Sequence, residues 1–142
     1  MTRPAVTVGL PVYNGANFLD EALASLSRQT FKDFTVLVSD NASTDRTPTI
    51  AENWARRDSR IRFFRHTRNI GPIDNLCWVL EQAQTPWFTV AAHDDKWSAG
   101  YIEALYKAAT AKPGIVSAAP QLVTFHGDGR SVLERQYIKQ RG

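Results

Sequence analysis

A repeated alternation of short apolar runs with amphipathic stretches is the feature that most constrains the fold. The apolar runs cover residues 5–10, 34–38, 61–65 and 87–91 and have the length and composition of buried strands. Between them, and again after the last, apolar residues recur at helical spacing, in the stretches from 17, 43, 73 and 101. This alternation predicts an α/β fold: a three-layer α/β/α sandwich with a mainly parallel sheet and right-handed crossovers.

The same periodicity predicts where the helices begin and which faces they bury. We expect Asn17 to open the first helix with Phe18 on its buried face, and Ser43 or Thr44 to cap the second. The buried face of the third helix is expected to comprise Ile73, Leu76, Cys77, Leu80 and Ala83. Cys77 is the only cysteine, so no intrachain disulfide can form, and we expect it to be a buried packing residue.

Beyond the fourth helix the pattern is weaker. Residues 115–118 and 122–125 are expected to be further strand, and residues 130–133 to pair back across a turn at Gly127, Asp128 and Gly129. We therefore divide the chain into a ligand-binding α/β domain over 1–112 and an incomplete second region over 113–142. The polar stretch 134–142 is expected to be a tail or an element cut off from its partner.

Composition sets broad limits on the kind of protein. The 142 residues carry a net charge of +3 and 43% hydrophobic residues, as in an ordinary soluble domain. Arginines gather between 56 and 68; a solvated face explains them better than an anionic surface, and no nucleic-acid partner is expected. With no apolar run near the length of a membrane span, we expect a cytoplasmic protein, at most peripheral at the inner membrane surface.

Polar side chains follow each predicted strand. They occupy residues 11–15, 40–45, 66–71 and 93–95. In open α/β sheets ligands bind beyond the carboxyl ends of the strands, so these loops should share one site. Neither a dinucleotide glycine fingerprint nor a P-loop is present, so a phosphate ligand would need a divalent cation, Mg²⁺ or Mn²⁺. Asp94 and Asp95 supply adjacent carboxylates for it, although such a pair more often caps a helix or faces solvent.

Five ordered segments carry a resemblance to a known family. They are VTVGLPVYN at 6–14, FLDEALASL at 18–26, VSDNASTD at 38–45, NIG with a following Asn at 69–75, and AHDDKW at 92–97. Together they resemble the nucleotide-binding part of family 2 glycosyltransferases, which have the GT-A fold. The match covers about residues 5–112 in order, and five ordered segments are far more specific than one.

The resemblance implies roles for individual residues. Pro11, Tyr13 and Asn14 would lie against the base and ribose of a nucleotide-sugar, and Asp40 would accept a hydrogen bond from N3–H of uracil or thymine. Asn69 would lie near the base or diphosphate, Asp94 near the ribose and cation, and Asp95 on the metal. The alternatives are that Tyr13 packs, that Asp45 merely starts a helix, and that Arg65 and Arg68 are surface residues.

The implied activity is that of an inverting enzyme. It would transfer a sugar, of hexosyl or rhamnosyl type, from UDP or dTDP to a glycan or lipid-linked acceptor in cell-wall or polysaccharide synthesis. A phosphate-transferring receiver or hydrolase domain is disfavoured, because no Asp ends the first strand.

Two departures from the family pattern qualify this expectation. Ala92 replaces the first acid of the D-x-D-D motif. Beyond the fourth helix, which contains Glu103, the chain has only two acids that could serve as the catalytic base, Asp128 and Glu134. We therefore expect the chain to stop before the acceptor half, to leave the base unidentified, and to self-associate through an exposed sheet edge. The alternative is a non-catalytic nucleotide-sugar-binding fragment or subunit.

Overall fold

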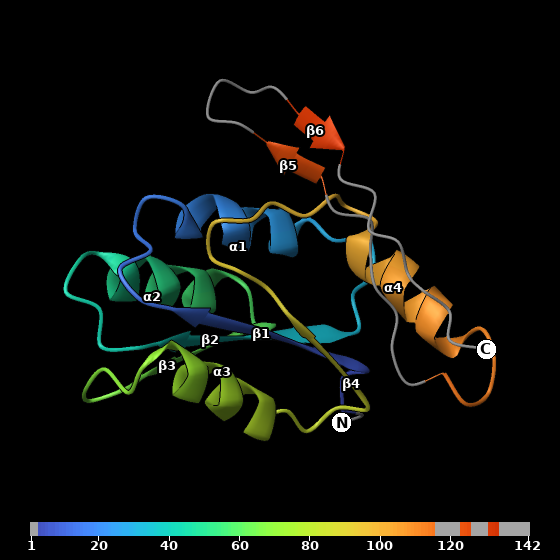
Figure 1. Cartoon of the computed structure of the whole chain (residues 1–142), viewed down its shortest axis with the longest axis horizontal. Coiled ribbons are helices and arrows are strands. Elements are labelled where there is room, and N and C mark those ends of the chain that lie inside the picture. Colours follow the sequence, from blue (N-terminus) through green and yellow to red (C-terminus); the bar gives the residue numbers. More distant parts are fainter. Residues whose placement is uncertain (1–2, 116–122, 126–130, 134–142) are drawn as a thin grey trace. The chain divides into compact units, whose positions relative to one another are not determined.

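A parallel four-stranded sheet organises the protein (Figure 1). The structure is a computed structural model that describes residues 3–115, 123–125 and 131–133. The strands stand in the order β3-β2-β1-β4 and every pairing is parallel. Their bounds are β1 Val6–Val12, β2 Phe34–Asp40, β3 Ile61–Arg65 and β4 Trp87–Val90. The predicted mainly parallel sheet is therefore confirmed.

Helices cover both faces of this sheet. Their bounds are α1 Leu19–Ser27, α2 Thr47–Arg57, α3 Pro72–Glu81 and α4 Tyr101–Thr110. In Figure 1, α1 and α2 lie on one face of the sheet, and α3 lies on the other, where it contacts β1 and β2. The three layers predicted from the alternation are thus present.

The chain separates into two compact units, Met1–Glu103 and Ala104–Gly142. In the second unit, β5 Val123–Phe125 pairs with β6 Ser131–Leu133 in antiparallel register. This confirms the strand expected at 122–125 and its return partner within the described residues. The expected turn at 127–129 lies outside them, as do residues 116–118 and the acids Asp128 and Glu134.

The core forms between the sheet and its helices. Leu10 in β1 and Leu19 and Leu23 in α1 are completely buried. Burying a side chain of this size contributes about 1.5–3 kcal/mol. The near-continuous apolar strands β1 and β2 are typical of a sheet covered on both faces, and they hold the strand ends in fixed register.

Two helix starts differ from the sequence expectation. The first helix begins at Leu19 rather than at Asn17, and Phe18, predicted to be buried, is 52% exposed. The second begins at Thr47, and neither Ser43 nor Thr44 caps it. The second prediction was wrong because Ser43 and Thr44 bond to Asn14 in the loop after β1. The first was wrong because the chain turns at Gly15, whose carbonyl accepts from the amides of Phe18 and Leu19.

The face that α3 buries also differs. Ile73 and Leu80 are 68% and 53% exposed, and Cys77 is exposed as well, so their predicted burial was wrong. Asn75 and Val79 face the sheet instead. The helix is rotated so that the amide of Asn75 reaches polar groups of β2, which leaves the apolar side chains outside.

Gly9 sets how closely α3 and β4 approach β1. A Cβ atom there would lie 2.7 Å from the Phe88 ring and 2.9 Å from a methyl of Val79. We expect Gly9→Ala to lower the free energy of unfolding by about 1–3 kcal/mol, because both side chains must shift. Urea unfolding followed by circular dichroism measures this. Gly100→Ala is the matched control, since a Cβ at Gly100 meets nothing within 4 Å, and equal stability losses in the two variants would contradict the explanation.

Candidate functional site

The loops that follow β1 and β2 are tied to each other by hydrogen bonds. The amide of Asn14 donates to Ser43 Oγ and that of Gly15 to Thr47 Oγ1, both at 2.8 Å. In return the amide of Thr44 donates to Asn14 Oδ1 at 2.8 Å. These bonds explain why Ser43 and Thr44 are not available as helix caps. They also fix Asn14, a predicted ligand, in a left-handed backbone conformation with φ of 50°.

Asp45 belongs to the same set of contacts. Its carboxylate accepts from the amide of Thr47 at 2.9 Å and from the amide of Ala16 at 3.1 Å. These hydrogen bonds to the charged form lower the pKa of Asp45, against the opposing effect of burial, which is the largest single influence. Of the two interpretations of Asp45, the structure favours the helix-start residue.

Asp40 is the last residue of β2 and its side chain is completely buried. The Nε atom of Arg65 lies 3.1 Å from its Oδ2, and the amide of Ser43 donates to both carboxylate oxygens at 3.2 and 3.4 Å. Arg65 also donates from Nη2 to the carbonyl of Ser43 at 2.9 Å. The expectation that Arg65 is only a surface residue was incomplete: half exposed, it pairs with the buried acid.

The loop after β3 is organised by two asparagines. Asn69 Oδ1 accepts from Asn41 Nδ2 at 3.0 Å and from the amide of Gly71 at 2.8 Å, while Asn41 Oδ1 accepts from the amide of Ile70 at 2.8 Å. Asn69, predicted as a ligand, therefore holds the loop through its carbonyl oxygen. Sequence reasoning assigned no role to Asn41, whose only signal was its place beside Asp40.

Asp94 and Asp95 follow β4 and are exposed. Partial burial, and then the neighbouring charge of Asp94, raise the pKa of Asp95 above its usual value, while His93 acts in the opposite direction. Within residues 3–115 no three His, Cys, Asp or Glu side chains come together as a metal site. Two adjacent carboxylates still suit a cation whose other ligands are phosphate oxygens and water.

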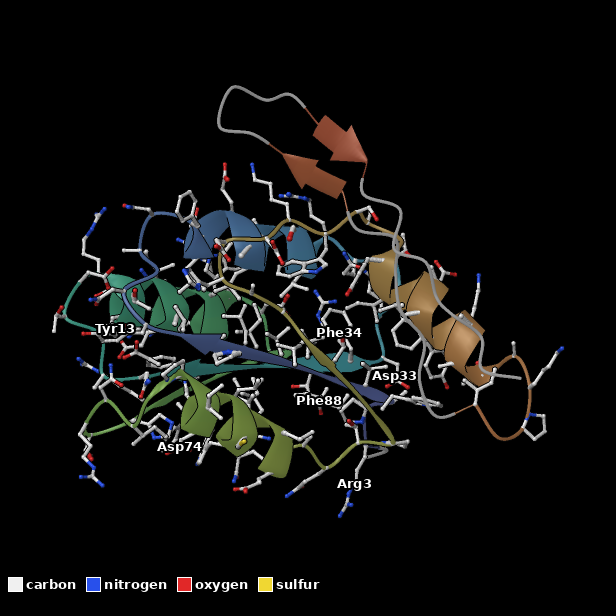
Figure 2. All side chains as sticks on the ribbon, in the orientation of Figure 1. Arg3, Tyr13, Asp33, Phe34, Asp74 and Phe88 are labelled. Atoms are coloured by element: carbon white, nitrogen blue, oxygen red, sulfur yellow. The ribbon has the colours of Figure 1, made fainter. Side chains whose placement is uncertain are left out.

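His93 brings this acidic loop to the loop after β1. A Cβ atom on Gly15 would lie 2.6 Å from His93 Cδ2, so the glycine is what allows the two loops to touch. Tyr13, in the same loop as Gly15, is 45% exposed, which does not favour a packing role. Figure 2 shows Tyr13 at the end of the sheet where β1 and β2 finish, away from Arg3 near the start of β1. Pro11 lies at the same end of β1 and is partly buried.

A hollow also exists at the opposite end of the sheet, where the strands begin. Its lining comprises Arg3, Pro4, Thr7, Thr35, Leu37, Arg62, Gln82, Gln84 and Thr85. These residues surround the amino ends of the strands, whereas parallel sheets bind ligands at the carboxyl ends. We therefore place the candidate site at the loops of Asp40 and Asp95.

Comparison with known proteins identifies the class. The sequence model of glycosyl transferase family 2 matches residues 7–141, so the chain belongs to this family. The structure is accordingly a GT-A fold, which agrees with the resemblance drawn from the five sequence segments.

Individual relatives are similar over the same region. The GalNAc(5)-diNAcBac-PP-undecaprenol beta-1,3-glucosyltransferase of Campylobacter jejuni is 32% identical over 107 residues, which are 75% of this chain and 35% of the relative. An uncharacterized glycosyltransferase of Haemophilus influenzae is 30% identical, over 67% of this chain and 38% of the relative. The chain therefore spans about a third of the length of these curated relatives.

Solved structures give the same picture. The mannosyltransferase PcManGT of Pyrobaculum calidifontis, in complex with GDP-Man and Mn²⁺, is 30% identical with a TM-score of 0.61, over 68% of this chain and 29% of that one. TarS 1–349 of S. aureus, in complex with UDP-GlcNAc, is 27% identical with a TM-score of 0.65, over 70% of this chain and 29% of that one. No helix in the described part of the chain is long and apolar enough to cross a membrane.

Proposed function

We propose that this chain forms the donor-binding half of an inverting glycosyltransferase. It would bind a UDP- or dTDP-sugar together with Mg²⁺ or Mn²⁺, for transfer of a hexosyl or rhamnosyl unit to a glycan or lipid-linked acceptor. The observation that carries the proposal is the convergence of the four loops that follow β1 to β4, with a buried Asp40 and an exposed Asp94–Asp95 pair. Family membership and similarity to structures that hold GDP-Man with Mn²⁺ or UDP-GlcNAc support it.

Each loop has a distinct role in this proposal. Asp40 accepts the N3–H of the base, and Pro11 and Tyr13 lie against the base and ribose. Asn14 holds the loops after β1 and β2 together, and Asn69 does the same for the loop after β3. In the ligand-free structure the side chain of Asp40 is completely buried and paired with Arg65. When the base binds, the half-exposed Arg65 must therefore either share the carboxylate of Asp40 with the base or move away.

The diphosphate would lie at the Asp94–Asp95 loop. A divalent cation bound there would offset the negative charge that develops on the leaving diphosphate. Asp95 is the first candidate ligand because it adjoins a second carboxylate: partial burial and then the charge of Asp94 raise its pKa, and a bound cation would relieve the repulsion between the two acids. The acceptor hydroxyl, activated by a base, attacks the anomeric carbon from the opposite side, so configuration inverts. The groups identified in this chain serve the leaving-group side of that reaction.

The metal requirement can be tested by calorimetry with UDP. We expect UDP to bind much more weakly in EDTA than with Mn²⁺, because no glycine-rich loop is present to hold the phosphates. Asp95→Ala should abolish the gain from Mn²⁺, and Asp33→Ala, an exposed acid at the other end of the sheet, should retain it. Equal UDP affinity with and without the cation would contradict the proposal.

A second candidate function is a nucleotide-sugar-binding fragment or subunit that transfers nothing. The observation that favours it is that the chain spans about a third of its curated relatives. Transfer also needs a base and an oriented acceptor, and no base has been assigned.

Turnover by the purified chain distinguishes the two functions. We expect inefficient transfer from UDP- and dTDP-sugars to a panel of acceptors, because general-base help alone typically contributes about 10²–10⁴-fold in rate. Mass spectrometry of the acceptors gives the result. Robust transfer that is abolished by Glu134→Gln or Asp128→Asn would show that the chain does contain its base.

We propose further that the isolated chain self-associates through its β4 edge with a second copy. Phe88 and Val79 both meet Gly9, so they lie on the same face of the sheet as α3, and Val90, two residues along the strand from Phe88, lies there too. Val90, 46% exposed, and the exposed α3 side chains Ile73 and Leu80 thus make that face apolar beside a strand edge that no described residue pairs. Such edges and patches favour association.

Sedimentation velocity tests this association. Leu80→Lys should shift the protein toward monomer, because it places a charge in the shared apolar face. Phe18→Lys is the matched control: Phe18 is 52% exposed, as Leu80 is 53%, but it precedes α1, on the opposite face of the sheet. A chain that is monomeric at all concentrations, or an equal response to the two variants, would contradict the proposal.

A further inference from the structure

A buried polar cluster lies directly behind the end of β2. Ser39 and Asn75 are 0% and 2% exposed, and they come from β2 and from the sheet-facing side of α3. Asn75 Nδ2 donates to the carbonyl of Ser39 at 3.0 Å, and Ser39 Oγ donates to Asn75 Oδ1 at 2.6 Å. One side-chain amide therefore holds both the backbone and the side chain of the residue that precedes Asp40.

His66 completes this cluster, which we call the Asn75 cluster (Ser39, His66 and Asn75). Its Nε2 lies 3.1 Å from both Ser39 Oγ and Asn75 Oδ1. The carbonyl of Ser39 can only accept, so it fixes Asn75 Nδ2 toward itself and Oδ1 toward the histidine. Because Oδ1 can only accept, the tautomer with the proton on Nε2 is the one that lets His66 donate to it.

Aromatic rings hold His66 in place. Its ring centroid lies 5.0 Å from that of Phe64 and 5.1 Å from that of Trp78, both edge-on. Phe64 and Trp78 stack on each other at 4.3 Å. The imidazole is thus packed between β3 and α3, so the cluster is rigid as well as hydrogen-bonded.

The cluster acts on Asp40 through the backbone. The backbone amide of His66 donates to the carbonyl of Asp40 at 2.9 Å. Ser39, which Asn75 holds, directly precedes Asp40 in the chain. Successive side chains on a strand point to opposite faces, so Ser39 points toward α3 while Asp40 points away from it. Asn75 therefore fixes the position of the acid from behind without contacting it.

The arrangement differs from ordinary core packing. Farther toward the start of the strands, the gap between α3 and the sheet is filled by apolar Val79 and Phe88, beside Gly9. At the strand end beneath Asp40 it is filled by three polar side chains whose bonds satisfy one another. Buried polar networks rigidify a structure when every member is satisfied, and they specify one arrangement more strictly than apolar contacts do.

We propose that Asn75 is a positioning residue for nucleotide recognition, which sets the place of the Asp40 carboxylate through Ser39 and His66. This inference rests on the proposed function for the role of Asp40 as the acceptor of the base. Removing the amide would release the end of β2, so that Asp40 no longer stands at a fixed distance from the base. Removing a residue that supports a ligand-binding side chain typically lowers ligand affinity by about 10–100-fold.

A double-mutant cycle on UDP binding in Mn²⁺ tests the proposal, at a temperature where circular dichroism shows every variant folded. We expect Asn75→Ala to weaken binding by about tenfold in the wild-type background and by less than about twofold in an Asp40→Asn background. Asn53 is an exposed asparagine on α2 whose Oδ1 accepts from Arg56 Nη1 at 3.2 Å, and Asn53→Ala should change nothing in either background. Equal weakening in both backgrounds, or none in either, would overturn the proposal.

A ligand-free measurement separates this inference from the proposed function. The Cγ chemical shift of Asp40, measured by carbon NMR, should move in Asn75→Ala, whereas that of Asp58, paired with Arg60 at 2.6 Å, should stay. General loosening would move both resonances, and an unmoved Asp40 resonance would refute positioning even if UDP binds. Failure of the wild-type chain to bind UDP, with the Asp40 shift moved as expected, would refute only the proposed function. If Asn75→Ala does not fold, Ser39→Ala takes its place. It removes the hydrogen bond from Ser39 Oγ to Asn75 Oδ1 and keeps the hydrogen bond from Asn75 Nδ2 to the carbonyl of residue 39.

Discussion

The buried carboxylate of Asp40 is the constraint on which the site depends. An ionised group that is completely removed from water must be compensated, since an isolated buried charge costs many kcal/mol. Here Arg65, the last residue of β3, and the backbone amide of Ser43, in the loop after β2, compensate the charge. The carboxylate therefore fixes the loop after β2 and the end of β3 together. Such an arrangement keeps an acceptor ready for a ligand that brings its own donor.

The apolar face of α3 follows from the same constraint. Placing Asn75 behind Asp40 rotates the helix so that Ile73 and Leu80 point to solvent. The inner face of the helix is instead formed by buried Val79 and by Asn75, which is hydrogen-bonded to Ser39. The position of the acid and the exposed patch are thus two results of one helix orientation.

Much of the fold could be predicted from the sequence, and the reasons are physical. Strand positions, the parallel sheet and the edge where the polar loops meet all follow from apolar runs such as Val6–Val12 and their spacing. The buried face of α3 could not be predicted, because periodicity treats Asn75 as polar and hence as exposed, while its partner Ser39 lies 36 residues away. The cap of α2 was mispredicted for the same reason, because Ser43 and Thr47 bond to residues about thirty positions distant. The ligand roles of Pro11, Tyr13, Asn14, Asp40, Asn69, Asp94 and Asp95 stay predictions.

The acidic loop after β4 differs in kind from the Asp40 site. Asp40 is compensated by Arg65 and the Ser43 amide without a ligand, whereas partial burial and then the neighbouring charge of Asp94 raise the pKa of Asp95. Two adjacent carboxylates repel each other, and a bound cation would relieve that repulsion. Under the proposed function, the base site would be assembled by the fold, and the cation site would be completed by oxygen ligands of the diphosphate. The cation and the nucleotide would then bind cooperatively, since each supplies what the other lacks.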